Sequence, residues 1–187
     1  MDDDRLLDRA GRGDPDAFSR LFERYQGRIF RYAAHMCGRE AADDVVQETF
    51  LAVLRPSGQY DARRGTVGNY LFGIARHLVL GRLSPREVTG VDFDTEDCPG
   101  AIGCDAPTVL DSLTRAETID TVRMAIASLP PLYREVLVLC ELQEMTYVDA
   151  AGIVDCPVGT VRSRLHRARA LLVAKLSALQ SPACIRK

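Results

Sequence analysis

The sequence predicts an all-α protein of two small helical domains, covering residues 1–83 and 117–187, joined by a flexible acidic linker. Two observations predict this fold class. Apolar side chains recur every three or four residues on both sides of the middle of the chain, as they do in helices that bury one face. From residue 84 to residue 116 this periodicity stops, and prolines and glycines accumulate among carboxylates, which is typical of a linker. A chain of 187 residues is long enough for two small domains.

The composition, with 47% hydrophobic and 27% charged residues, is that of a soluble globular protein. The N-terminus is acidic and leads into no apolar stretch, and no later window has the length of a membrane span. We therefore expect no signal peptide, no membrane insertion and a cytoplasmic location. The six cysteines form no CxxC pair, which favours reduced thiols over a disulfide framework in that compartment.

Three helices are expected in the first domain. The first begins near Asp14-Pro15, a sequence typical of a helix start, and carries apolar residues as far as Met36. The second begins near Glu40 and ends before Pro56-Ser57-Gly58, a cluster that breaks helices. The third runs from about residue 66 to residue 83. The side chains expected to point inward from the second helix are Val45, Val46, Thr49, Phe50 and Val53. The third helix is expected to carry Tyr70, Leu71, Ile74, Leu78 and Val79 on or near one face.

The second domain contains a helix-turn-helix pattern. Helical spacing returns at Ile119, is interrupted at Pro130-Pro131 and resumes as far as Cys140. A short helix over residues 146–153 is then followed by a turn over residues 154–156 and by a helix that opens at Pro157. Thr146 is suited to cap the first of these helices, and Pro157 suits a first turn, where its missing N–H has no partner. Two short helices across a tight turn form a common DNA-binding unit.

The helix that opens at Pro157 is amphipathic. With successive residues about 100° apart, its apolar side chains gather around Val161 as a buried stripe; they are Val158, Leu165, Ala168 and Leu172. The remaining surface is polar, and residues 157–175 carry five basic residues and no acidic one. Small polar side chains permit close approach to base edges, and arginines contact guanine edges or phosphates. The candidate DNA-binding residues are Gly159, Thr160, Arg162, Ser163, Arg164, His166, Arg167 and Arg169.

Arginines on an exposed helix are usually only solvated, and that alternative applies to this helix as well. Two features favour DNA binding over simple solvation. The charge has a single sign and lacks the interleaved glutamates of an ordinary surface helix, and the helix follows a helix-turn pattern.

The residues of the second domain resemble region 4 of the extracytoplasmic-function (ECF) sigma factors of RNA polymerase, in the sigma-70 family. The resemblance rests on LPPLYREV at residues 129–136, on Thr146-Tyr147 and on CPVGTVRSRLHRAR at residues 156–169. It implies that this domain contacts the minus-thirty-five promoter element through the second helix of the pair. It also implies a packing role for Cys156 in the turn.

The first domain is similar to the same family in two places. DDVVQETFL at residues 43–51 resembles region 2.2, the helix that docks on the clamp helices of the largest polymerase subunit. Helical spacing places a polar and acidic set on one face of this helix, which could also be merely solvated. The resemblance implies that this set binds polymerase, and it consists of Asp44, Gln47, Glu48 and Leu51.

Residues 60–77 (YDARRGTVGNYLFGIARH) are similar to regions 2.3 and 2.4, which in relatives open the minus-ten element and hold an unstacked base. Such a site needs positive charge along the backbone and a platform or pocket for the base. Tyr60 and Tyr70 could instead be core or rim aromatics. The residues implied for minus-ten contact are Tyr60, Arg63, Arg64, Asn69, Arg76 and His77.

The chain departs from the family pattern at the end of this segment. His77 stands where many relatives carry asparagine, which puts the minus-ten preference in doubt. Relatives carry a run of arginines after this helix, whereas this chain has only Arg82 before Leu83-Ser84-Pro85. This predicts weaker contact with duplex DNA there and a larger share of the affinity from polymerase.

The linker is acidic, with two basic and seven acidic residues from residue 84 to residue 116. In the family this connector threads through the active-site cleft and the RNA exit channel of polymerase, although a solvated spacer explains the composition equally well. The partners that the resemblance implies are core RNA polymerase and promoter DNA, with an anti-sigma factor as a further candidate.

The main alternative function is a helix-turn-helix regulator that binds duplex DNA without polymerase. That alternative predicts a sensory or receiver domain upstream, and the helical first domain shows no such pattern. We expect no enzyme, cofactor or metal site, because the sequence has no glycine-rich phosphate loop, nucleophile elbow or paired metal motif. A metal- or redox-sensing role for Cys98, Cys104 and Cys184 stays a lesser hypothesis, since their spacing matches no standard zinc site.

Overall fold

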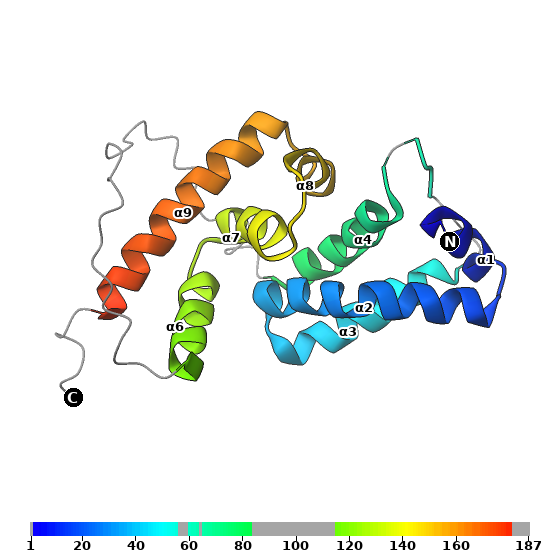
Figure 1. The fold of residues 1–187 in the computed structure, drawn as a ribbon, viewed down its shortest axis with the longest axis horizontal. Helices are drawn as coiled ribbons and strands as arrows, with labels where there is room; N and C mark the ends of the chain where they lie inside the picture. The colour runs from blue at the N-terminus through cyan, green and yellow to red at the C-terminus, as the bar shows by residue number, and fades with distance from the viewer. Residues whose placement is uncertain (1, 56–59, 64, 84–114, 181–187) are drawn as a thin grey trace.

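A computed structural model describes residues 2–55, 60–63, 65–83 and 115–180 of the chain. Every regular element in these ranges is a helix, so the predicted all-α class is confirmed (Figure 1). The sensing hypothesis on Cys98, Cys104 and Cys184 falls outside the described residues, and so do Arg64 and nearly all of the predicted linker.

The first domain consists of α1 (Asp3–Gly11), α2 (Pro15–Cys37), α3 (Arg39–Val53) and α4 (Val67–Arg82). The last three correspond to the predicted helices. The sequence analysis missed α1, which packs on α2 and buries Leu6, Leu7 and Ala10. Its three apolar positions in nine residues are too few to reveal a helical period.

Local side-chain chemistry fixes where these helices begin. The carboxylate of Asp14 accepts hydrogen bonds from the backbone N–H groups of Asp16 and Ala17, at 3.0 and 3.1 Å. The hydroxyl of Thr66 accepts from the N–H of Asn69 at 3.2 Å and so caps α4. Between α2 and α3 the backbone turns at Gly38, whose φ of 89° is one that glycine adopts without strain.

The core of the first domain lies where α2 meets α3 and α4. All five residues predicted to point inward from α3 are buried. Of the residues expected on or near one face of α4, Leu71 and Val79 are buried, and Tyr70, Ile74 and Leu78 are half-buried. The fully buried residues of α4 also include Phe72 and Ala75, and the Phe72 ring packs edge-on against Tyr32 with 5.6 Å between ring centroids.

The second domain consists of α6 (Arg115–Ala127), α7 (Pro131–Leu137), the π-helix η1 (Val138–Leu142), α8 (Tyr147–Val154) and α9 (Val158–Gln180). Helices α6, α7 and α8 all pack against α9, the longest helix of this domain. After η1 the chain passes through Glu144, whose φ of 55° is unusual for a residue other than glycine. The chain changes direction between α7 and α8 through the wide turn of η1 and the left-handed backbone of Glu144.

The two domains pack directly against each other. Helix α4 of the first domain lies against α8 of the second, and α2 contacts α6, α7 and η1. In Figure 1 the long α2 and α4 meet the second domain at one end, while α1 lies at the far end of the molecule. The two domains therefore lie side by side, and the second domain partly covers the α4 face of the first.

None of the described helices combines the length and the apolar character that a membrane crossing requires.

Candidate functional site

The helix-turn-helix forms as the sequence predicts. The hydroxyl of Thr146 accepts a hydrogen bond from the N–H of Asp149 at 3.1 Å and caps α8. The turn is made by Asp155 in the left-handed conformation, with φ 56° and ψ 53°, followed by Cys156, whose N–H donates to the carbonyl of Ala151 at 3.2 Å. Asp and Asn tolerate this conformation better than most residues, so the turn suits Asp155.

Helix α9 presents the predicted polar face to solvent. Val161, Leu165 and Ala168 are buried, and Val158 and Leu172 pack partly buried against the core. The candidate DNA-binding residues lie on the remaining surface: Gly159, Arg162, Ser163, His166 and Arg169 are exposed, and Thr160, Arg164 and Arg167 are intermediate in exposure.

Ser163 and Arg169 have polar partners within their own domain. The hydroxyl of Ser163 donates to the carbonyl of Thr160 at 3.0 Å. The Nε of Arg169 donates to the carboxylate of Glu141 at 3.1 Å, and this hydrogen bond raises the pKa of the guanidinium. An exposed ion pair of this kind is weak, so Arg169 can exchange Glu141 for another anion.

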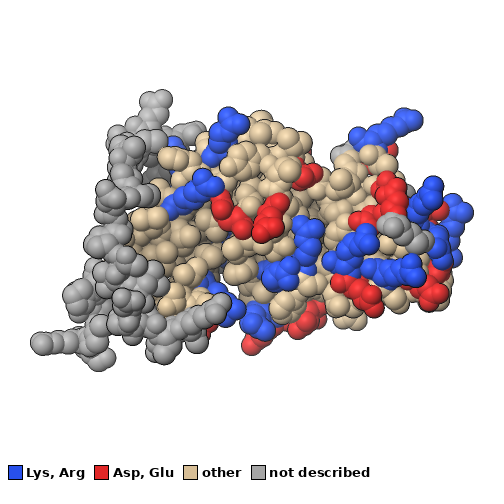
Figure 2. Space-filling model, in the orientation of Figure 1, with Lys and Arg blue, Asp and Glu red and all other residues tan. Residues whose placement is uncertain are grey.

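The charges are distributed unevenly over the surface. Figure 2 shows side chains of both signs crowded over the α1 end of the molecule. Over α7, α8 and α9 the same view shows a mainly uncharged surface with a few separate charged groups. A polyanion meets fewer carboxylates around α9 than at the α1 end.

Four of the predicted minus-ten residues, Tyr60, Arg63, Asn69 and His77, border two neighbouring cavities of about 780 and 590 Å³. Tyr60, Gly65, Thr66 and Asn69 line both of them. The second cavity also has Tyr70 and His77 in its wall, whereas the first is bordered by carboxylates of α1. Each cavity has room for a nucleic-acid base, and both have carboxylates as well as arginines in their walls, with Glu48, Asp61 and Arg55 in the second.

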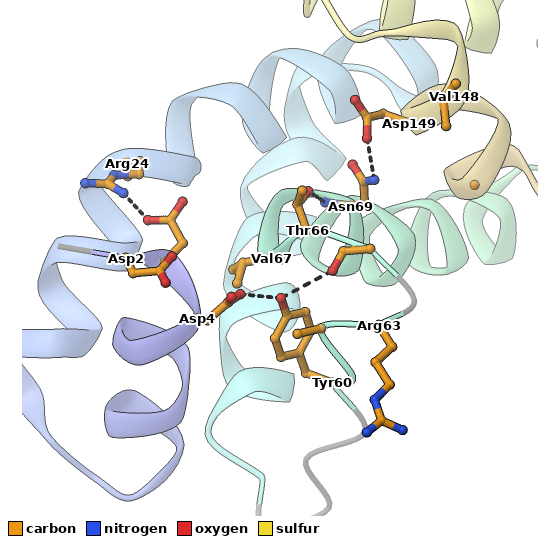
Figure 3. A pocket seen from close by; sticks show the side chains of 14 residues that line it. Asp2, Asp4, Arg24, Tyr60, Arg63, Thr66, Val67, Asn69, Val148 and Asp149 are labelled. Carbon is orange, nitrogen blue, oxygen red and sulfur yellow. Dashed lines mark hydrogen bonds and ion pairs between the residues drawn. The ribbon is translucent and has the colours of Figure 1, made fainter.

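Tyr60 stands between these cavities (Figure 3). Its hydroxyl donates a hydrogen bond to the carboxylate of Asp4, and its ring is tilted against that of Tyr70 with 5.4 Å between centroids. Burial and the neighbouring Asp4 carboxylate raise the pKa of the Tyr60 phenol. Tyr60 is therefore held in place by α1, and Tyr70 packs beside it, an arrangement that sequence reasoning missed together with α1 itself.

The other minus-ten candidates lie apart from one another. Arg63 is exposed and lines the first cavity, and His77 is exposed on α4 and lines the second. Asn69 and Arg76 are only partly exposed, because both are hydrogen-bonded to the second domain. The amide of Asn69 donates to Asp149 at 2.7 Å, and the Nε of Arg76 donates to Glu135 at 2.9 Å.

Sequence reasoning did not single out Glu135 or Asp149. Glu135 is only 2% exposed although it is charged. Its position directly before the apolar run Val136-Leu137-Val138-Leu139 was the available signal, because a carboxylate that is buried beside such a run must find a partner.

The predicted polymerase-binding residues form one exposed face of α3. Asp44, Gln47, Glu48 and Leu51 are all exposed, and Leu54 extends the face with an apolar side chain that is 41% exposed. Glu48 forms an ion pair with Arg82 of α4 at 2.6 Å. Exposed leucines beside carboxylates are unusual for a merely solvated face and suit a protein partner.

Within the described residues, no three His, Cys, Asp or Glu side chains are grouped so that they could hold a metal ion. The described thiols of Cys37, Cys140 and Cys156 are free, and burial raises the pKa of Cys37 and Cys140.

Both domains match models of known families. Residues 21–86 match Sigma-70 region 2, and residues 119–172 match Sigma-70, region 4. The first match contains α3 and α4, and the second contains the helix-turn-helix.

Solved structures share this arrangement of helices. CnrH, solved in complex with the cytosolic domain of CnrY, aligns with a TM-score of 0.68 and 26% identity over 95% of this chain and 99% of that one. The sigma factor RpoE from Bartonella quintana, solved with the anti-sigma factor NepR, aligns with a TM-score of 0.62 and 25% identity over 86% of this chain and 96% of that one.

Relatives of similar length are named as sigma factors. The RNA polymerase sigma-H factor of Pseudomonas aeruginosa is 36% identical over 89% of this chain and 90% of its own. The ECF RNA polymerase sigma-E factor of Haemophilus influenzae is 32% identical over 96% of this chain and 97% of its own. Because the two family models match in order and these relatives align over nearly their whole length, the chain belongs to the sigma-70 family, among its ECF RNA polymerase sigma factors.

Proposed function

We propose that the two domains of this sigma factor divide the work of promoter recognition. The first domain binds core RNA polymerase through the exposed face of α3 and contacts the minus-ten element with residues of α4 and the segment before it. The second domain contacts the minus-thirty-five element through α9. The protein acts in the cytoplasm as a subunit of polymerase and carries no catalytic centre of its own.

The observation that carries this proposal is the surface of α9. Its apolar stripe is buried, and its exposed side bears arginines together with small residues close to the N-terminal end. A recognition helix needs this arrangement, because its first turns approach the base edges while arginines contact guanines and phosphates. The regulator alternative is set aside, since both family models and the named relatives belong to sigma factors.

The cavities beside Tyr60 support the minus-ten assignment. A base that leaves the stack needs an aromatic platform and a pocket, and the paired rings of Tyr60 and Tyr70 stand at the edge of one. His77 lies in the same cavity wall and is therefore positioned to influence which base is accepted.

The direct test is run-off transcription with core polymerase, with and without the purified chain, on fragments that cover the genome of the source organism. The expected result is one set of start sites that depends on the chain. Equal transcription with and without it on every fragment would contradict the proposal.

Substitutions separate the roles of the two domains. Ser163→Ala and Arg167→Ala change the face of α9 and should alter discrimination among minus-thirty-five sequences, at about 1–3 kcal/mol for a lost base contact. Asp44→Ala and Glu48→Ala change the exposed face of α3 and should weaken binding to core polymerase without altering sequence preference.

A core-binding assay and a panel of promoter variants measure the two effects on the same proteins. Asp8→Ala is a control, because Asp8 is an exposed carboxylate of α1 that pairs with Arg12, the residue that follows this helix. If Asp44→Ala and Glu48→Ala shifted promoter preference and left core binding unchanged, the assignment of α3 would be wrong.

A further inference from the structure

The first turn of α1 lies against the segment that leads into α4. Two consecutive carboxylates of this turn each accept a hydrogen bond from a tyrosine hydroxyl in another part of the first domain. Tyr25 of α2 donates to Asp3 at 2.6 Å, and Tyr60 donates to Asp4, as Figure 3 shows for the second pair. Helix α1 therefore connects α2 with the residues that border the two cavities.

Asp3 anchors this turn to α2. Its carboxylate forms an ion pair with Arg24 in addition to the hydrogen bond from Tyr25, which is itself buried. Further along α1, Leu6 is buried in the core of the first domain. Asp4 is therefore an acceptor whose position is fixed by the packing of α1 alone.

The side chain of Tyr60 is held at two points. Asp4 accepts from its hydroxyl, and the ring of Tyr70 packs against it with 5.4 Å between centroids. The carbonyl of Gly65 also lies 3.3 Å from the hydroxyl. A phenol has one proton to donate, however, and the Asp4 carboxylate is both the closer and the charged acceptor. Asp4 thus decides where the Tyr60 ring points.

The charge of Asp4 by itself opposes DNA binding. Asp4 lines the first cavity together with Asp2 and Asp3, and Tyr60 lines both cavities. A negative charge beside a nucleic-acid site repels phosphates and weakens binding. A favourable contribution of Asp4 to DNA binding must therefore come through the group that it holds, which is Tyr60.

From this arrangement we propose that Asp4 is a positioning residue for minus-ten recognition: its carboxylate fixes the Tyr60 ring at the border of the two cavities, in the orientation in which an unstacked base packs on it. The inference rests on the proposed function of Tyr60 as the platform for that base. A ring that is already held loses little conformational entropy when the base arrives, so more of the stacking energy is retained as affinity. Without Asp4, the Gly65 carbonyl is the acceptor left for this hydroxyl among the described residues, and the ring samples more than one orientation.

The two effects of Asp4 have opposite signs, so substitutions can separate them. Asp4→Ala removes both the acceptor and the charge, whereas Asp4→Asn removes the charge and keeps an acceptor. Asp2→Ala is the matched control, because Asp2 is exposed and lines the same cavity, whereas the Tyr60 hydroxyl binds Asp4. Circular dichroism checks that each variant stays helical.

The first measurement tests the hydrogen bond in the free chain by fluorine NMR. A fluorotyrosine at position 60 carries its fluorine next to the hydroxyl, so the chemical shift reports the environment of the phenol. Asp4→Ala should move this resonance, Asp4→Asn should move it less, and Asp2→Ala should leave it at the wild-type position. Identical spectra for the wild type and Asp4→Ala would show that Asp4 does not hold Tyr60 and would overturn the inference.

The second measurement is the affinity of the holoenzyme, formed from core polymerase and the full chain, for a promoter fragment found by run-off transcription. Asp4→Ala should bind this fragment about tenfold more weakly than the wild type, because part of one base stack is lost. Asp4→Asn should recover most of the affinity. Asp2→Ala should bind as tightly as the wild type or more tightly, since it removes only a repulsive charge.

Fragments that lack one base distinguish positioning from a general loss of stability. In each fragment one non-template nucleotide of the minus-ten element is abasic, and the position at which the wild type loses most affinity marks the unstacked base. On that fragment Asp4→Ala and the wild type should bind nearly alike, because no base is left to pack on Tyr60. If Asp4→Ala were weaker by the same factor on intact and abasic fragments, it would act through the stability of the fold, and the inference would be wrong.

A double variant tests whether the two residues act as a unit. Tyr60→Phe should lose as much affinity for the intact fragment as Asp4→Ala, and the double variant should lose no more than either single one. Core binding and discrimination among minus-thirty-five sequences should be unchanged in all three proteins. Additive losses of affinity would contradict the inference.

A failure of the proposed function gives a different pattern. If run-off yields no start site that depends on the chain, the minus-ten role of Tyr60 falls and the inference falls with it, although the fluorine spectra would still show the hydrogen bond. If run-off succeeds and Asp4→Ala binds the intact fragment as tightly as Asp2→Ala, the proposed function stands and the inference alone is wrong.

Discussion

At the scale of single residues, Gln143 has the least favourable environment in the described part of the chain. Its side chain lies just after η1, is buried, and finds no hydrogen-bond partner there for either its oxygen or its nitrogen. Its backbone carbonyl, by contrast, accepts a hydrogen bond from Arg28 of the first domain at 3.2 Å. A buried amide without partners costs roughly 1–3 kcal/mol.

Gln143→Met should therefore raise the free energy of unfolding by about 1 kcal/mol or more, because methionine has a similar shape and leaves no polar atom unpaired. Urea denaturation followed by circular dichroism measures the change. Gln143→Glu is the matched comparison and should lower stability, since it buries a charge. Lower stability in the methionine variant would show that the amide has a partner such as an internal water.

At the scale of elements, the helix-turn-helix depends on the cap of α8 and on the turn that follows it. Thr146 is exposed, and its hydroxyl both accepts from the N–H of Asp149 and donates to the Asp149 carboxylate at 2.7 Å. Its contribution is therefore mainly local to the start of α8.

Thr146→Ala removes the cap and should lower the free energy of unfolding of the chain by about 1 kcal/mol. Thr146→Ser keeps a hydroxyl at the same position and should retain most of the stability. Denaturant midpoints of the three proteins measure the effect. Equal losses in the serine and alanine variants would mean that the threonine methyl group, not the cap, is what stabilises α8.

The turn gives a second prediction for this element. Asp155 has φ 56°, a conformation that costs a β-branched residue about 1–2 kcal/mol. Asp155→Val should lower the melting temperature and weaken use of the minus-thirty-five element, because the angle between α8 and α9 depends on this turn. Asparagine tolerates the same conformation, so Asp155→Asn should preserve the melting temperature and the use of the minus-thirty-five element. A valine variant as stable as the wild type would contradict this account.

At the scale of the whole molecule, the domain contact should depend on pH through His35 of α2. Burial lowers the pKa of this imidazole, and Arg123 of α6 and Arg134 of α7 lower it further. In an open molecule, whose two domains have separated, the two arginines are distant, so the pKa lies nearer the ordinary value of 6.5. The closed state, in which the domains are in contact, therefore binds a proton less readily than the open state.

The sign of the effect follows from that difference. Above about pH 6.5 His35 is neutral in both states and closure is unaffected, whereas below it the open state gains protons first and is favoured. Energy transfer between fluorophores carried by non-natural amino acids at the exposed positions Ser19 of α2 and Ala174 of α9 should fall as the pH is lowered from 8 toward 5.5. His35→Gln should remove this part of the pH dependence, and an unchanged pH profile in that variant would exclude His35 as its source.

Much of the fold could be predicted from local chemistry. The cap at Asp14, the breaker at Pro56-Ser57-Gly58 and the apolar spacing of α9 depend on neighbours within one or two turns, so the sequence displays them directly. The buried face of α3 was predicted correctly because its apolar residues recur at helical spacing on the side that packs against α2 and α4. On α4 only part of the expected apolar set is fully buried, and the contacts of this helix with α1, α2, α3 and α8 decide which part.

The sequence by itself determined the helical class, the helix-turn-helix and its exposed basic face, and through its motifs the resemblance to ECF sigma factors. The tertiary structure alone decided that α1 holds Tyr60 and that Glu135 and Asp149 engage Arg76 and Asn69. Those pairs join residues 56 to 80 positions apart, and no local pattern records which distant carboxylate meets which donor. Only packing of the two domains brings them together, because a buried charge such as Glu135 is tolerated only where partners from both α2 and α4 converge on it.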